Sequence, residues 1–301
     1  MPYRRGALLA RAQGLDRRRP RADRAGFVSA PQDPVLLLCA HGSTSRSAQI
    51  ATEEITASVA QALPGIDVIL TWVDVQEPDV VDRCEEFADR PVVIVPLLLS
   101  AGFHVHQDLA RAVAGRSHHV VTGALGPDRS LSELMARRIA HAEARTTAVR
   151  RPEAAPALHE ALVASSAETA APAIVLVAAG SSDDRAVQDV RRQAADLAEL
   201  TGRDVRTGFV SAVEPSAHDA VAGAWRDGAR DVTTVSFHVA PGVFHADAVR
   251  AAQTAAEGLP ATSARAGGRV TEPLLVDGTE VPPELVDVVL KRWEEGKALL
   301  P

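Results

Sequence analysis

Val-Leu-Leu-Leu-Cys-Ala-His-Gly-Ser, residues 35–43, is the stretch that decides the fold we expect for this chain. An apolar run of this length, bounded by Gly and Ser, is typical of a buried parallel strand, and the polar residues 43–47 open a segment of helical period. His41 is therefore expected at the carboxyl end of a strand, where ligands bind in open parallel α/β sheets. A histidine at a strand end can also serve structure alone, by capping a helix or binding a loop carbonyl.

The residues that follow alternate between strand and helix patterns. The predicted strands are 35–39, 68–73, 92–99 and 120–125, and the predicted helices are 48–63, 79–88, 107–114 and 131–148. This alternation indicates an α/β fold in which a parallel sheet of about four strands has helices on both faces and right-handed crossovers.

The second half of the chain repeats this pattern. Its predicted strands are 174–178, 205–210 and 232–239, and its predicted helices are 186–200, 217–225, 247–257 and 283–299. Three landmarks recur at offsets of 138, 137 and 140 residues, pairing His41 with Ala179, Glu77 with Glu214, and Gly102 with Gly242. Such agreement indicates an internal duplication, with two lobes (34–150 and 173–301) around a pseudo-twofold axis and a cleft between them.

Two segments differ in composition from the lobes. Residues 1–33 are rich in arginine and lack sustained periodicity, which predicts a disordered basic extension or, alternatively, a basic contact arm. The apolar run 7–10 in this extension is too short for a signal peptide. Residues 151–172, rich in Ala and Pro, are expected to be a linker.

Composition restricts the classes of function. The net charge of −7 argues against nucleic acid and anionic membranes as partners, and no apolar run approaches the roughly 20 residues of a membrane span. Cys39 and Cys84 cannot supply the four thiolates that an iron–sulfur cluster usually takes. We expect both to be buried, reduced thiols of a cytoplasmic protein.

The duplication offers an internal comparison for each candidate site residue. Three polar groups at predicted strand ends in the first lobe have apolar or neutral counterparts in the second: His41 corresponds to Ala179, Asp74 to Ser211, and His104 to Phe244, or to Val243 if one residue is gapped. If the fold alone needed these groups, the second lobe should need them too. Two imidazoles and a carboxylate at neighbouring strand ends would suit a divalent first-row metal ion.

Several motifs together resemble one family. Ala-His-Gly-Ser (40–43), the segment 74–78 and Pro-Leu-Leu-Leu-Ser-Ala-Gly-Phe-His (96–104), with Asp108 downstream, resemble the class II sirohydrochlorin chelatases, including the long form with two fused halves. The resemblance covers nearly all of residues 35–301. It implies two chelatase-like lobes and an ATP-independent insertion of Fe²⁺ or Co²⁺ into sirohydrochlorin, in siroheme or cobalamin synthesis, without a nucleotide. Ni²⁺ would accept the same ligands. Because the duplication removes the need for a homodimer, we expect a monomer.

The resemblance also implies roles for particular residues. His41 and His104 would bind the metal ion, and Asp74 stands where the family often has a glutamate. We expect Asp74 and Glu77 to neutralise charge and relay protons, although the recurrence of Glu77 as Glu214 is equally consistent with a turn role. Ser43, Arg46 and Gly102 are the candidate substrate contacts, but residues 44–46, Thr-Ser-Arg, replace the family's more usual Arg-Asp-Pro.

Two further histidines are open to more than one interpretation. His106 is either a third ligand or part of a helix start equivalent to that at His245, and His238, in an apolar strand, is interpreted as a core histidine with satisfied hydrogen bonds.

Two other functions use the same residues. A strand followed by His-Gly also resembles the histidine phosphatases, but that family requires an arginine before the histidine and this chain has Ala40. A non-catalytic carrier of a divalent metal ion would need the same ligands without turnover.

Overall fold

The computed structural model describes residues 33–100, 102–149, 172–229, 231–257, 267–276 and 278–301, without the side chains of residues 103–106, 146–149 and 267. Residues 33–301 form one compact unit. The predicted basic extension and linker lie, apart from their last residues, outside the described residues. No helix within the described ranges has the length and the apolar character needed to cross a membrane.

The first lobe contains the predicted four-stranded sheet. Its strands are β1 (Val35–Ala40), β2 (Val68–Trp72), β3 (Val92–Pro96) and β4 (His119–Val121), all parallel and in the order β2-β1-β3-β4. Every residue of the central strand β1 is buried, because helices cover both faces of the sheet.

The helices of the first half are α1 (Arg46–Ala62), α2 (Val80–Glu86), α3 (Phe103–Val113) and α4 (Arg129–Val149). Helix α2 begins after Asp79, whose side chain accepts a hydrogen bond from the amide of Asp82 and so caps the helix. Helix α3 begins four residues earlier than the predicted 107, directly after the extended backbone of Gly102.

The second lobe repeats this topology. Its strands are β5 (Ala173–Ala178), β6 (Val205–Phe209), β7 (Asp231–Ser236) and β8 (Gly267–Val270), in the order β6-β5-β7-β8. Strand β8 was not predicted, because its sequence, Gly-Gly-Arg-Val, contains no apolar run. The helices are α6 (Asp184–Thr201), α7 (Ala217–Arg226), α8 (Val243–Glu257) and α9 (Pro283–Lys297).

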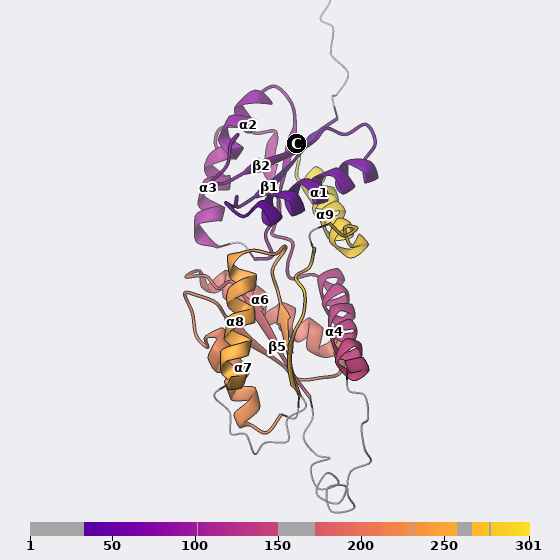
Figure 1. Cartoon of the computed structure of the whole chain (residues 1–301). Coiled ribbons are helices and arrows are strands. Elements are labelled where there is room, and N and C mark those ends of the chain that lie inside the picture. Colours follow the sequence, from indigo (N-terminus) through magenta and orange to yellow (C-terminus); the bar gives the residue numbers. More distant parts are fainter. Residues whose placement is uncertain (1–32, 101, 150–171, 230, 258–266, 277) are drawn as a thin grey trace, which may run out of the picture. The chain divides into compact units, whose positions relative to one another are not determined.

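The two halves of the chain exchange their last helices (Figure 1). Helix α4, from the first half, packs against α6 and also contacts β7 and β8 of the second lobe. Helix α9, from the second half, packs against β3 and α1 of the first lobe. Each lobe is therefore completed by a helix from the other half of the sequence, which the internal duplication did not predict.

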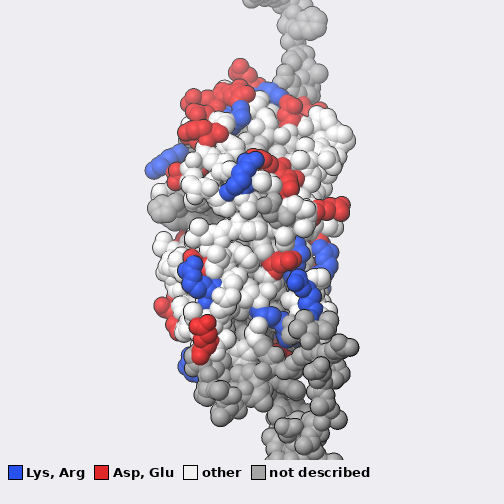
Figure 2. Space-filling model, in the orientation of Figure 1, with Lys and Arg blue, Asp and Glu red and all other residues white. Residues whose placement is uncertain are grey.

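Charge is unevenly distributed over the face shown in Figure 2. Acidic side chains gather on this face near α2, while the middle of the face is largely uncharged. The net charge of −7 is therefore not spread evenly over the surface in this view.

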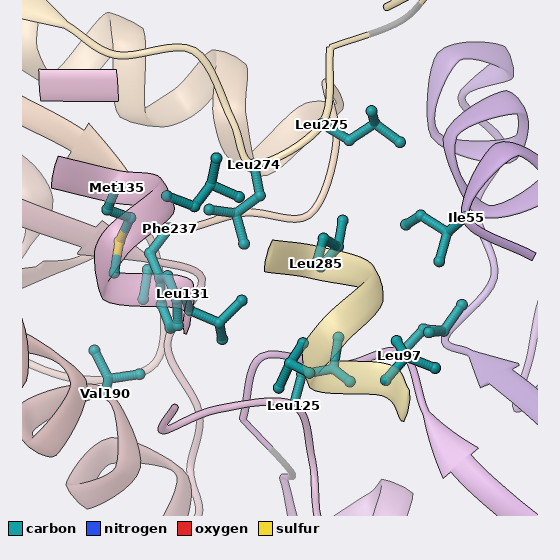
Figure 3. Close-up of a cluster of buried hydrophobic side chains, with 14 of the residues drawn as sticks. Ile55, Leu97, Leu125, Leu131, Met135, Val190, Phe237, Leu274, Leu275 and Leu285 are labelled. Carbon is teal, nitrogen blue, oxygen red and sulfur yellow. The ribbon is translucent and has the colours of Figure 1, made fainter. Parts of the chain in front are cut away.

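One apolar core runs through both lobes (Figure 3). It joins one face of each sheet to α1, α4, α6 and α9, and it includes Ile55, Leu97, Leu131, Phe237 and Leu285. The opposite face of each sheet has a separate cluster, under α2 and α3 in the first lobe and under α7 and α8 in the second. The shared core holds the strand ends of both sheets at a common boundary.

A buried polar network crosses the same boundary. Asp128, before α4, exchanges backbone hydrogen bonds with the Gln193 side chain of α6 at 2.9 and 3.0 Å, and Gln193 also donates to the hydroxyl of Ser132 at 2.6 Å. The Asp128 carboxylate binds Lys291 of α9 at 2.6 Å. Burial alone would raise the pKa of Asp128, but hydrogen bonds from Lys291 and Ser130 hold it below its usual range.

Candidate functional site

A cavity of about 760 Å³ lies between the lobes, at the carboxyl ends of the central strands. Its lining includes His41 and Leu98 from the first lobe and Ala179 and His238 from the second. This is the predicted cleft, and the volume falls in the range of small-molecule and cofactor sites, about 300–1,000 Å³.

The turn that carries His41 packs closely against the turn that carries Asp74. Gly42 has φ +96°, and a Cβ atom there would lie 1.9 Å from the carbonyl oxygen of Asp74, so only glycine fits. The amide of Asp74 donates to the carbonyl of His41 at 3.0 Å. The structure therefore brings these two predicted site residues together, at adjacent strand ends.

The side chains of the Asp74 turn face different ways. The Asp74 carboxylate is exposed and accepts a hydrogen bond from the amide of Val75 at 2.7 Å. Val75 has φ 70°, a strained conformation for a β-branched residue, and lines the cavity with 52% of its surface exposed. Within the turn 74–78, Val75 and Gln76 line the cavity, whereas Asp74 and Glu77 do not.

Glu77 makes the same contact as its counterpart in the second lobe. Its carboxylate accepts from the amide of Asp79 at 3.2 Å, and that of Glu214 accepts from the amide of Ser216 at 2.7 Å. Asp79 and Ser216 are the N-caps of α2 and α7. This repetition favours a turn role for Glu77.

Two of the three candidate substrate contacts, Ser43 and Gly102, line the cavity. Ser43 lines it, but its amide already donates to the Gln76 side chain at 3.0 Å. Gly102 also lines it, and a Cβ atom there would lie 3.1 Å from the hydroxyl of Ser181 in the second lobe. Arg46 is outside the lining, with 72% of its side chain exposed and a 3.8 Å ion pair to Glu53.

The backbone of His104 follows Gly102 in the first turn of α3, next to the cavity lining. The side chains of His104 and His106 lie outside the described part of the chain. Among the described residues, no group of three or more His, Cys, Asp or Glu could hold a metal ion. The metal-binding roles of His41 and His104 remain predictions.

Sequence reasoning missed a cluster of Ser236, His238 and His245 in the second lobe. The Ser236 hydroxyl lies 2.9 Å from Nδ1 of His238 and 2.8 Å from Nδ1 of His245. Both histidines line the cavity. Contrary to our interpretation of a satisfied core histidine, Nε2 of His238 is buried without a hydrogen-bond partner among the described residues.

The helix starts fix how this cluster aligns with the first lobe. Helices α3 and α8 begin at Phe103 and Val243, so that Phe244 is equivalent to His104, and His245 is equivalent to Val105 rather than to His106. A comparison of the halves in the opposite direction, starting from the second lobe, could have found the cluster.

Both cysteines are buried in the first lobe. Burial raises the pKa of the Cys84 thiol to about 11, and that of Cys39 still further. Both therefore stay protonated at neutral pH and do not act as thiolate ligands or nucleophiles.

Comparison with known proteins supplies a family. The model of the CbiX family matches residues 35–142 and 173–277, which is more than half of the chain. No match was found among curated proteins.

Three solved structures share the two-lobed fold. SirB from Bacillus subtilis with Fe³⁺ is 18% identical, with a TM-score of 0.63 over 88% of this chain and 96% of that one. SirB from Bacillus subtilis subspecies spizizenii, a sirohydrochlorin chelatase in complex with cobalt, is 15% identical, with a TM-score of 0.59 over 87% and 94%. CbiX, described as the terminal enzyme of siroheme biosynthesis in denitrifying bacteria, is 20% identical, with a TM-score of 0.54 over 87% and 98%.

Proposed function

The chain belongs to the CbiX family, and on this premise we propose that it inserts Fe²⁺ or Co²⁺ into sirohydrochlorin without a nucleotide. The observation that carries the proposal is the cavity of about 760 Å³ between the lobes, with His41 in its wall. The names of the structural relatives SirB and CbiX point the same way, and the two SirB structures hold Fe³⁺ and cobalt.

The reaction exchanges one cation for two protons. A free-base macrocycle carries two pyrrole N–H groups, and both N–H bonds break as four nitrogen–metal bonds form. The site must therefore hold the metal ion loosely and take up protons. A neutral imidazole can do either at neutral pH, whereas a rigid, high-affinity cage would retain the ion.

In this proposal His41 and His104 present the metal ion to one face of the macrocycle. His41 is supported by its place in the cavity wall, and His104 by its place in the first turn of α3, after the lining residue Gly102. Asp74, fixed beside His41 by the backbone hydrogen bond, lowers the cost of bringing a dication to this edge. Nickel accepts the same ligands and would compete with iron and cobalt.

The described lining of the cavity includes no Lys or Arg. An uncharged wall suits the face of the macrocycle, so we place the substrate carboxylates at the cavity mouth. Ser43 and Gly102 would lie against the ring system, and Arg46 would meet a carboxylate outside it. The long 3.8 Å ion pair of Arg46 with Glu53 leaves its guanidinium available for that contact.

The proposal includes a monomer that acts in the cytoplasm. Its support is that residues of both lobes of one chain line the cavity, so no second copy is needed to build it. Two buried thiols, free rather than paired in a disulfide, are consistent with a reducing compartment.

The histidine-phosphatase alternative is not favoured by the described site. Such an enzyme clamps the phosphoryl group with cationic side chains, and none lines the described cavity wall. A metal carrier is separated from a chelatase only by turnover.

The test compares His41→Ala with His141→Ala, a matched removal of an exposed histidine outside the cavity. Sirohydrochlorin and Co²⁺ or Fe²⁺ are mixed with each protein, and the absorbance change of metal insertion is followed. We expect His41→Ala to lose at least about 100-fold in rate and His141→Ala to match the wild type.

Other results would contradict the proposal. Wild-type turnover by His41→Ala would remove the assignment of His41. Metal binding by the wild type with no insertion would indicate a carrier, and hydrolysis of p-nitrophenyl phosphate would indicate a phosphatase.

A further inference from the structure

Ser236, His238 and His245 form a connected chain of hydrogen bonds in the second lobe. Ser236 ends β7, His238 follows two residues later, and His245 lies in the first turn of α8. The Ser236 hydroxyl is within 2.9 Å of one Nδ1 atom and 2.8 Å of the other. The amide of Ser236 donates to the hydroxyl of Thr271 at 3.0 Å, which fixes the serine in place.

Because one hydroxyl group is hydrogen-bonded to both rings, the two neutral imidazoles must be in opposite tautomers. A serine hydroxyl has a single hydrogen and can donate to only one Nδ1 atom, so the other imidazole must donate its own Nδ1–H to the serine oxygen. When both rings are neutral, one therefore carries a free lone pair on Nε2 and the other carries Nε2–H. A proton gained at the first Nε2 can pass through the hydroxyl and leave from the second.

At one end of this hydrogen-bond chain, Nε2 of His238 has no partner within the described part of the protein. His238 is 8% exposed, and its Nε2 is buried without a hydrogen-bond partner among the described residues. An unpaired buried polar atom destabilises the folded state, which makes such atoms rare. The ring of Phe244, which also lines the cavity, stacks on the His238 ring with centroids 6.4 Å apart.

At the other end of the hydrogen-bond chain, His245 is more exposed than His238. His245 is half-buried, and Glu272 lies close enough to raise its pKa against the larger lowering by burial. Burial lowers the pKa of His238 to about 3, with a smaller contribution from His245. Both rings are therefore neutral at neutral pH, and a proton that reaches His238 stays on that ring only if the ring gives up its Nδ1 proton at the same time.

The fold does not require the cluster. The strand register pairs Cys39 with Pro96 in the first lobe and Val177 with Ser236 in the second, so that Pro96 stands at the position of Ser236. Two residues further along, Leu98 stands at the position of His238. The first lobe builds the same strand end and helix start without any of the three polar groups.

We propose that His238, Ser236 and His245 are a proton relay that receives one pyrrole proton while the metal ion enters from the first lobe. This inference rests on the proposed metal insertion. Substrate binding uncovers Nε2 of His238, which is buried in the free protein, the pyrrole N–H bond breaks, and its proton bonds to that nitrogen. The Nδ1 proton of His238 moves to the Ser236 oxygen, the hydroxyl hydrogen moves to Nδ1 of His245, and the Nε2 proton of His245 leaves to water.

One passage reverses both tautomers. As the product leaves, while Nε2 of His238 is still uncovered, a proton from water enters at Nε2 of His245 and one leaves from Nε2 of His238, which restores the starting arrangement. The second pyrrole proton leaves on the side of His41 and Asp74. In this arrangement His238 touches the reacting proton, while Ser236 and His245 act through it.

The kinetic test uses Ser236→Ala and His238→Ala in the full chain, with sirohydrochlorin and Co²⁺. We expect kcat to fall by about 10- to 100-fold in both, with KM for sirohydrochlorin unchanged. Added imidazole should restore much of the rate of His238→Ala and none of that of Ser236→Ala. Ser216→Ala is the control, because this N-cap of α7 lies outside the cavity and its loss should lower stability without changing kcat.

Each outcome decides one claim. If kcat of both Ser236→Ala and His238→Ala lies within twofold of the wild-type value, the relay is overturned and metal insertion stands. A change in KM without a change in kcat has the same consequence. Absence of insertion by the wild type overturns the proposed function, and the relay with it.

A second measurement does not depend on activity. In ¹⁵N-histidine-labelled protein, NMR should find His238 and His245 in opposite neutral tautomers in the wild type, with this coupling lost in Ser236→Ala. Identical tautomers in the wild type would overturn the relay.

Discussion

The two lobes share one backbone plan but carry different polar groups at and next to the carboxyl ends of their strands. The first lobe has His41 and Asp74 where the second has Ala179 and Ser211. The second lobe has Ser236 and its two histidines where the first has Pro96, Leu98 and Val105. The comparison shows that each lobe carries a polar set that the other lacks.

What the lobes have in common is the structure of their turns. Gly42 and Gly180 both have positive φ, and in each a Cβ atom would lie 1.9 Å from the carbonyl oxygen of the facing turn. Glu77 and Glu214 make the same hydrogen bond before a helix. Groups present in both lobes therefore hold the strand ends, and groups present in one lobe are the candidates for chemistry.

The largest expected effect tests the exchanged helices. Trp293 of α9 and Trp225 of α7 are both almost fully buried, and replacement of either by Ala should cost about 3–5 kcal/mol of unfolding free energy. Because α9 packs on β3 and α1, Trp293→Ala should speed hydrogen exchange in the first lobe, although the residue belongs to the second half. Trp225→Ala should speed it around β5–β7. Faster exchange confined to the second lobe in both variants would contradict the exchange of helices.

A smaller effect tests the equivalence of the turns. Gly42→Ala and Gly180→Ala should each lower the unfolding free energy by roughly 2–3 kcal/mol, because both force a side chain into a left-handed backbone against a carbonyl. Urea denaturation measures both. The turns would not be equivalent if the two losses differed by more than about 1 kcal/mol, which is larger than the change that a typical surface substitution causes.

The smallest effect concerns the network that joins the lobes. The Asp128 pKa is lowered in the folded state, so its contribution is complete above the unfolded pKa of about 4 and is lost as pH falls through the folded value. Asp128→Asn should therefore cost about 1–2 kcal/mol at pH 7, and this cost should shrink as the pH falls below about 4. Chemical denaturation across pH measures it, and a cost independent of pH would contradict the assignment.

Much of the fold was predictable from the sequence, because it depends on local patterns. The apolar run 35–39 and the offsets between the halves predicted two parallel sheets and a cleft, and the structure confirms both. Strand β8 was missed because Gly-Gly-Arg-Val pairs with β7 through its backbone and shows no apolar periodicity. The exchange of α4 and α9 was not predictable, since a duplicated pattern does not say which sheet a connecting helix covers.

The site was predictable only in part. His41 and Asp74 are predicted because they end predicted strands and have apolar or neutral counterparts in the other half, and the structure joins their backbones by a hydrogen bond of 3.0 Å. His238 was missed because an apolar strand predicts burial and says nothing of hydrogen bonds. Its contact with Ser236 and His245 depends on how β7 and α8 meet in space.

The exchange of helices has a consequence for synthesis on the ribosome. The residues of β1 and β3 that face the shared core are made early, but α9, the helix that packs on β3, is made only after the strands of the second lobe. The first sheet therefore keeps part of an apolar face open while about half of the chain is still to be translated, a period in which chaperones can bind it. The packing beneath the wall that carries His41 is complete only when α9 docks.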